Sequence, residues 1–236
     1  MSSFILSFDN VTKKFESVTA LKSLSFKVPE NKITGLIGSN GAGKTTTLRL
    51  IVRYLTPDSG TILYRNKDIY SLPDSSFPIS YIPDTPIYFE ELTVKEHLSF
   101  ISAMYQTESN VQNLIDVLKL ERHLDKVPSV LSRGTKQKLI IACALLRNFD
   151  FLIADEPFSG LDPKQIKTFK DLLLEEKKKG KTILLSTHLL DMIENICDYY
   201  IMIDDGELLA QGTLTELINN SKCSTLEELY LYLADC

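Results

Sequence analysis

One stretch of eight residues, Gly38 to Thr45, constrains the fold of this chain more than any other. It reads GSNGAGKT, fits the pattern G-x-x-x-x-G-K-[ST], and connects the apolar run ITGLI to a segment of helical pattern, TTTLRLIVRYL. Glycines let backbone N–H groups surround a phosphate, and the positive end of the following helix points at the same place. The stretch therefore predicts a phosphate-binding loop (P-loop) inside a strand–loop–helix unit.

Two residues of this loop have predicted tasks of their own. The Lys44 ammonium neutralises β- and γ-phosphate oxygens, and the Thr45 hydroxyl ligates Mg²⁺. The alternative, a flexible glycine-rich turn, does not require this pattern between a strand and a helix. The residues expected to bind the phosphates are Ser39, Asn40, Gly41, Ala42, Gly43, Lys44, Thr45 and Thr46.

A pair of adjacent carboxylates ends another apolar run, FLIADEP. Successive residues on a strand point to opposite sides, so Asp155 and Glu156 have different tasks. Asp155 is expected to reach the Mg²⁺ shell, and Glu156 to polarise a water towards the γ-phosphate. An acid pair that only caps the next helix is the alternative, because acidic residues favour helix starts. Beside a phosphate loop, the catalytic interpretation is favoured.

A histidine follows a third apolar run, TILLSTH, which places His188 just past its end. Ligands of open α/β sheets bind at the carboxyl ends of the strands. We therefore expect the phosphate loop, Asp155, Glu156 and His188 to meet at one edge of a sheet, with His188 in a catalytic role. The other histidines, His97 and His123, lie in a helical region and receive no role.

The apolar patterning predicts strands that alternate with helices. ITGLIG, FLIAD, TILLST and YYIMI are continuous apolar strands, which indicates a mostly parallel sheet covered on both faces. Alternation over Phe4, Leu6 and Phe8 and again over Leu24, Phe26 and Val28 indicates half-buried β structure, with turns at Asp9-Asn10 and at Pro29-Glu30-Asn31. A short strand is predicted over Thr61 to Tyr64 and at Ile69, and a loop over 71–80.

Helical patterning dominates from Thr93 to about Leu124. We interpret the chain as one domain, 1–236. Its core comprises 1–80 and 131–215 and includes an antiparallel β subdomain, 85–130 is a helical subdomain, and 216–236 is a helical tail. The tail sequence TLEELYLYLADC is amphipathic, which favours packing on its own domain and leaves a partner site as the alternative.

Composition excludes some classes of protein. The net charge of −5 does not favour a nucleic-acid partner. The four cysteines contain no C-x-x-C pair and read as reduced thiols, with Cys143 as a small buried residue. No apolar run reaches the roughly 20 residues that span a bilayer, so any membrane role requires a partner.

In its order of motifs, the sequence resembles the ATP-binding cassette (ABC) family over residues 4 to 215. GSNGAGKTT resembles the Walker A motif, FLIADEP the Walker B motif, and SGLD, Ser159 to Asp162, the D-loop. His188 matches the switch histidine, and Phe15 the aromatic ring that lies under adenine. The resemblance implies an α/β fold with a RecA-like P-loop NTPase core, a mostly parallel sheet, an antiparallel β subdomain and a helical insert. It also implies ATP and Mg²⁺ as cofactors and an ATPase activity.

The stretch LSRGTKQKL lies where the family has its signature loop. The resemblance implies that two chains enclose two ATP, so that Ser132, Arg133 and Gly134 contact the nucleotide of the other chain. The Ser132 hydroxyl, the Gly134 N–H and a helix start are suited to an anion. An ordinary helix N-cap by Ser132 is the alternative. Arg133 and Thr135 depart from the commonest wording, LSGGQ.

A second departure lies at the Q-loop, in YIPDTPIYFEELTVKEHL, where Asp84 replaces the usual Gln. Asp84 is able to hold the Mg²⁺ water shell but adds negative charge near the γ-phosphate. Exporter-type subunits are similar in three features: an acid at this position, the Thr-Pro that follows it, and the residues KQK after the signature. Among them, the sequence most resembles the EcsA-like branch.

The resemblance thus implies the ATP-driven subunit of an ABC transporter, which we expect in the cytoplasm at the inner face of the membrane. A separate permease is expected to contact residues 81–105, with Tyr81 to Glu91 as the coupling surface. Transport is expected to be export, and a homodimer is favoured over a heterodimer.

Two other classes of function fit the sequence less well. A soluble cassette ATPase acting on a non-transport assembly usually carries two cassettes or a long coiled-coil insert, and this sequence has neither. A GTPase needs Asn-Lys-x-Asp after a strand, which is not found, and neither a GTPase nor a small-molecule kinase explains a signature loop.

Overall fold

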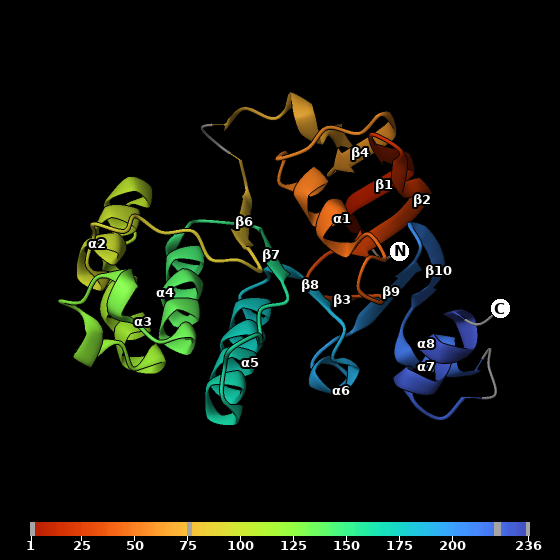
Figure 1. Cartoon of the computed structure of the whole chain (residues 1–236). Helices are drawn as coiled ribbons and strands as arrows, with labels where there is room; N and C mark the ends of the chain where they lie inside the picture. The colour runs from red at the N-terminus through yellow and green to blue at the C-terminus, as the bar shows by residue number, and fades with distance from the viewer. Residues whose placement is uncertain (1–2, 75–76, 220–222, 235–236) are drawn as a thin grey trace.

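The computed structural model describes residues 3–74, 77–219 and 223–234. A six-stranded sheet in the order β10-β9-β3-β8-β7-β6 forms its centre (Figure 1). Only β10 pairs antiparallel in this sheet, with β9. Its strands are β3 (Ile33–Ile37), β6 (Ile79–Ile82), β7 (Phe151–Asp155), β8 (Thr182–Thr187), β9 (Tyr199–Asp204) and β10 (Glu207–Gly212). The predicted mostly parallel sheet is confirmed.

A separate antiparallel sheet, in the order β2-β1-β4-β5, lies above the central one (Figure 1). Its strands are β1 (Phe4–Phe15), β2 (Val18–Pro29), β4 (Ser59–Tyr64) and β5 (Lys67–Asp68). The predicted turn at Asp9-Asn10 is wrong, because β1 continues through it. A register shift between Phe8 and Val11 absorbs Asn10 in a left-handed conformation with φ 50°, as a β-bulge does.

Bulging also explains a second difference near the N-terminus. Leu6 and Phe8 are buried as the alternation predicts, and Phe8 stacks on Phe26 with ring centroids 4.4 Å apart. Phe4, in contrast, is 38% exposed. The register shift between Phe4 and Leu6 lets consecutive residues Ile5 and Leu6 both point inwards, so Phe4 leaves the buried face.

Two short segments also differ from the prediction. Ile69 begins a 3₁₀ turn, Ile69–Ser71, rather than a strand, because the Asp68 carboxylate accepts a hydrogen bond from the Tyr70 N–H at 2.9 Å. The end of the predicted 71–80 loop is the start of β6, which pairs in parallel with β7. β6 spans only four residues and depends on a strand far away in the sequence, so local patterning does not reveal it.

Helices cover both faces of the central sheet, as Figure 1 shows. Local capping defines several of them: Thr93 and Glu96 form a capping box at α2, and Asp162 and Gln165 form one at α5. The helices are α1 (Lys44–Ile51), α2 (Val94–Tyr105), α3 (Val111–Leu118), α4 (Arg133–Leu146), α5 (Pro163–Lys178), α6 (Leu190–Ile193), α7 (Leu214–Asn219) and α8 (Leu226–Ala234).

Two apolar cores result from this layering. In β7, Leu152 and Ala154 point into the core shared with α4 and α5, whereas Phe151 and Ile153 point into the core shared with α1 and the antiparallel sheet. All five residues of β7 are buried, so the sheet is covered on both faces as its continuous apolar strands predict. The α/β fold with a P-loop core is confirmed.

Candidate functional site

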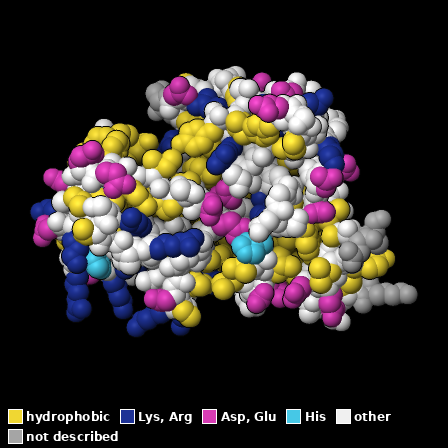
Figure 2. All heavy atoms as spheres, in the orientation of Figure 1, with side chains coloured by type: hydrophobic (Ala, Val, Ile, Leu, Met, Phe, Trp, Pro, Cys, Tyr) yellow, Lys and Arg dark blue, Asp and Glu magenta, His cyan; other side chains and the backbone are white. Residues whose placement is uncertain are grey.

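Parallel pairing brings three loops together at one edge of the central sheet. The phosphate loop follows β3, Glu156 follows β7, and His188 follows β8. A cleft of about 260 Å³ lies at this edge, and Figure 2 shows acidic side chains and a histidine around the hollow in the middle of the visible face. The residues that line the cleft are Ala20, Asn40, Gly41, Gly43, Lys44, Thr45, Thr46, Asp84 and Glu156.

The phosphate loop ends at a helix start that has no side-chain cap within the described residues. Gly43 is the N-cap of α1, with φ 102°, and no side chain caps this helix start. A Cβ at Gly43 would lie 2.7 Å from the Leu21 side chain and 2.9 Å from the Ala20 carbonyl oxygen. Both the left-handed backbone and this close approach require glycine. The helix start therefore offers unpaired donors and a positive dipole end to an anion.

Lys44 lies folded into the loop and is only 6% exposed. Its Nζ donates to the Gly38 carbonyl oxygen at 2.7 Å and to that of Ser39 at 3.0 Å. The Oε1 of Glu156 lies 3.8 Å from Nζ. Burial lowers the pKa of Lys44, and the nearby carboxylates of Glu156 and Asp155 oppose this. An ammonium held by neutral carbonyls in this way is suited to an incoming phosphate.

Asp155 is the most buried acid of the site, at 1% exposure. The Ser186 hydroxyl donates to its Oδ1, whereas its buried Oδ2 has no hydrogen-bond partner within the described residues. Burial raises the pKa of Asp155, and the negative charge of Asp84 adds to the rise. A buried carboxylate oxygen without a partner is costly unless a cation or donor completes it. One carboxylate, the Thr45 hydroxyl and phosphate oxygens form a donor set that suits Mg²⁺.

Glu156 adopts a left-handed backbone, with φ 45°. Such a conformation costs about 1–3 kcal/mol for a residue with a Cβ. It is held in place because the Glu156 N–H donates to both the carbonyl and the hydroxyl oxygen of Ser186, each at 3.1 Å. The bend directs the Glu156 carboxylate to His188, whose Nδ1 lies 2.9 Å from Oε1. The Glu156 Oε1 is therefore close to both the Lys44 ammonium and the His188 ring.

The remaining predicted residues lie around this cleft at different distances. Asp84 is exposed in the loop after β6 and lines the cleft, near enough to raise the pKa of Asp155. Phe15 ends β1, is 42% exposed, and has the Lys13 ammonium 5.5 Å from its ring centroid. Phe15 is therefore free to stack on a flat ligand, but it is separate from the residues that line the cleft.

The signature residues lie away from the cleft of their own chain. Ser132 caps α4 and accepts from the Thr135 N–H at 3.3 Å, so the N-cap alternative is correct for the single chain. The Arg133 guanidinium donates to the hydroxyl of Ser159, and a Cβ at Gly134 would lie 2.9 Å from the Gly160 carbonyl oxygen. The signature residues thus pack on the 159–162 loop.

The sequence interpretation missed several groups that shape the site. Ser186 holds Asp155, and the parallel register of β7 with β8 pairs these two residues directly. A correct alignment of the two predicted strands would have found it. Asp204 and Tyr230 hydrogen-bond to Ser39 of the phosphate loop. No local sequence pattern predicts either contact.

Comparison with known proteins matches this geometry. The ABC transporter family matches residues 21–159. The ATP-binding protein EcsA of Bacillus subtilis, an ABC-type transporter protein, is 38% identical over 97% of this chain and 96% of its own length. This chain belongs to the ABC transporter family. It is an ATP-binding subunit of that family, whose members hydrolyse ATP.

Other relatives agree in sequence and structure. The bacitracin transport protein BcrA of Enterococcus faecalis is 32% identical over 91% of this chain and 71% of its own length. A solved ATP-binding subunit of an ABC transporter has a TM-score of 0.91 and 34% identity and covers 98% of this chain and 99% of its own. A cassette solved in its ADP conformation has a TM-score of 0.78 and 27% identity, with coverage of 98% and 99%.

Two features outside the cleft complete the description. None of the helices in the described residues is long and apolar enough to cross a membrane. Cys143 is partly buried and packs against the core, whereas a buried residue was expected, and burial raises the pKa of its thiol to about 12. Cys236 lies outside the described residues.

Proposed function

We propose that two copies of this ABC subunit close around two ATP and drive a separate membrane permease that exports its substrate. The observation that carries the proposal is the split between two groups of motif residues. Lys44, Thr45 and Glu156 line one cleft, while Ser132 and its neighbours lie away from it. A second chain is needed to bring a signature loop to each nucleotide.

Within the cleft, each residue is proposed to act on the ATP phosphates. The N–H groups at the start of α1, from Gly43 to Thr46, bind the phosphate oxygens, and Lys44 exchanges its carbonyl partners for them. Mg²⁺, when bound, neutralises charge on the phosphate oxygens; Thr45, Asp155 and Asp84 are proposed to hold it directly or through water. Phe15 is proposed to stack on the adenine.

Proton transfer is assigned to Glu156, with His188 as its partner. The Glu156 carboxylate accepts the proton of the attacking water as general base. The His188 Nδ1–H donates to Glu156 Oε1 and so fixes the direction of the carboxylate. Because Lys44 Nζ also lies 3.8 Å from the same oxygen, the Glu156 carboxylate has two cationic or donor partners before any water arrives.

The proposed permease contact lies in residues 81–105. Four apolar side chains in this range are strongly exposed, at 72% for Ile87, 54% for Phe89, 44% for Phe100 and 53% for Met104. Phe89 and Phe100 meet edge to face at 5.7 Å, and the buried His97 accepts the Phe89 N–H through Nε2 at 3.1 Å. An exposed apolar patch of this kind is typical of a protein interface.

Export is supported by the function of a relative. Nod factor export protein I of Ralstonia nicotianae is 32% identical over 96% of this chain and 72% of its own length. No comparable observation favours a soluble, non-transport assembly, which remains the alternative function.

Co-purification tests the proposed permease contact. Candidate permeases from the source genome are co-expressed with wild type, Phe89→Ser, or Leu231→Ser as a control at an exposed leucine on α8. Wild type and Leu231→Ser should retain the membrane protein and Phe89→Ser should lose it, with ATP hydrolysis of the isolated chain unchanged in all three. Equal recovery with Phe89→Ser would contradict this surface.

A further inference from the structure

The C-terminal helix α8 reaches back to the phosphate loop. The Ser39 N–H donates to the Tyr230 phenol oxygen at 2.7 Å, and the Ser39 hydroxyl donates to Asp204 Oδ1 at 2.8 Å. The Tyr230 hydroxyl points at the same Oδ1 at 3.4 Å, which closes a triangle of hydrogen bonds. Residues separated by 191 positions along the chain thus meet at the start of the loop.

The peptide group that joins Gly38 to Ser39 connects this triangle to Lys44. Its carbonyl oxygen accepts from Lys44 Nζ at 2.7 Å, while its N–H donates to Tyr230 at the same distance. Hydrogen bonds on the two ends of one peptide polarise each other and strengthen together. Movement of the phenol would therefore rotate the carbonyl that holds the lysine.

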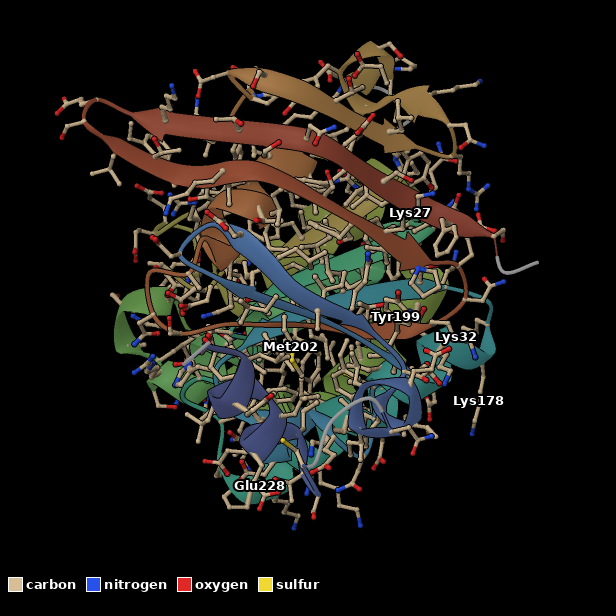
Figure 3. All side chains as sticks on the ribbon, turned by 90° about the vertical axis from the view of Figure 1, so that its right-hand side faces the viewer. Lys27, Lys32, Lys178, Tyr199, Met202 and Glu228 are labelled. Atoms are coloured by element: carbon tan, nitrogen blue, oxygen red, sulfur yellow. The ribbon has the colours of Figure 1, made fainter. Side chains whose placement is uncertain are left out.

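Packing fixes α8 in this position. Leu226 and Leu229 of α8 are buried at 1% and 2% exposure in one core with Leu217 of α7 and Leu190 of α6. Figure 3 shows α7 and α8 in front of the central sheet, where they contact β10. α8 also contacts α6, which begins two residues after His188.

From these contacts we propose that Tyr230 is a positioning residue for the ATP site. Its hydroxyl holds the Gly38–Ser39 peptide so that Lys44 and the loop N–H groups are in place before ATP binds, and ATP binding in turn stabilises α8. The inference rests on the proposed role of the phosphate loop. The buried face of α8 packs on its own domain, as the amphipathic pattern of the tail favours.

Calorimetry with ATP–Mg²⁺ tests the proposal in the full chain. Glu156→Gln is used as background to prevent turnover, with Tyr230→Phe as the variant and Tyr232→Phe as the control, since Tyr232 is 58% exposed on the same helix. Loss of one hydrogen bond should raise the Kd about 3- to 10-fold for Tyr230→Phe and leave Tyr232→Phe unchanged. Equal Kd values for the two phenylalanine variants would overturn the inference.

Amide hydrogen exchange gives a readout that a merely structural role would not move. Saturating ATP–Mg²⁺ should slow exchange in 226–234 in the Glu156→Gln chain, and Tyr230→Phe should remove this ATP-dependent change, because coupling between two sites is reciprocal. Exchange in α8 that ignores ATP would overturn the inference. If Lys44→Ala binds ATP with the same Kd as its parent, the proposed phosphate site is wrong. If Lys44→Ala loses ATP binding and Tyr230→Phe does not, only the proposed role of Tyr230 is wrong.

Discussion

The helices α1 and α4 both have a glycine at or near their start, but they differ in how their first N–H groups are satisfied. α1 starts at Gly43 in a left-handed conformation, and no side chain caps it. α4 starts at Ser132, whose own hydroxyl accepts from the Thr135 N–H. The α1 start lies inside a cleft with a buried lysine, whereas the α4 start is exposed and packs on the 159–162 loop.

This difference in capping suits the two helix starts to different parts of the proposed nucleotide site. Open N–H groups beside Lys44 make α1 able to bind phosphate within its own chain. The start of α4 is capped and exposed, and we propose that it contacts the nucleotide of a second chain through Ser132 and Gly134. A site divided in this way is complete only in a dimer, which is the reason for proposing one.

The largest effect on ATP hydrolysis is expected in the cleft at the α1 start, where the proposed base Glu156 follows β7. Glu156→Gln should lower kcat about 10²- to 10⁴-fold while ATP still binds, because the amide cannot accept the proton. Steady-state ATP hydrolysis and calorimetry measure the two effects, with the exposed Glu175→Gln on α5 as the control. A kcat within threefold of wild type (roughly the limit of a structural effect) would remove Glu156 from the chemistry.

Removal of the buried ammonium should weaken binding rather than turnover alone. Lys44→Ala should raise the Kd for ATP–Mg²⁺ about 10- to 100-fold, the value of a charge-assisted hydrogen bond. Lys32→Ala, at the exposed opposite end of β3, should leave the Kd unchanged. Equal Kd values for the two variants would mean that the ammonium at the α1 start does not bind the nucleotide.

A stability difference should separate the two helix starts in the absence of nucleotide. Ser132→Ala removes the N-cap of α4 and should lower the free energy of unfolding by about 1 kcal/mol. The exposed Ser129→Ala should change it by less than about 0.5 kcal/mol. Urea unfolding of the isolated chain measures both, and equal values would mean that the Ser132 hydroxyl does not cap α4 in solution.

The smallest expected effect is a shift in pH dependence. The negative charge of Asp84 raises the pKa of Asp155, so Asp84→Asn should lower that pKa. Asp155 then stays ionised to lower pH, and the acid limb of ATP hydrolysis should move to lower pH by less than about one unit. A shift to higher pH, measured as kcat/KM against pH, would have the wrong sign and would contradict the placement of Asp84.

Much of the site followed from sequence because its elements are local. The phosphate loop, the β7 carboxylates and His188 each follow a continuous apolar strand, and the parallel sheet brings strand ends together. The missed features depend on distant pairing. β6 needs β7 to form, Asn10 is absorbed by a bulge set by β2, and Tyr230 reaches Ser39 only after α8 has packed.

The mass of Glu156→Gln in solution, with and without ATP–Mg²⁺, tests the central claim most directly. The chain should be a monomer without nucleotide and a dimer with it, and a further Ser132→Arg change should return it to a monomer that still binds ATP. A chain that binds ATP yet stays monomeric at every concentration, or a dimer that Ser132→Arg leaves intact, would contradict a site divided between two copies.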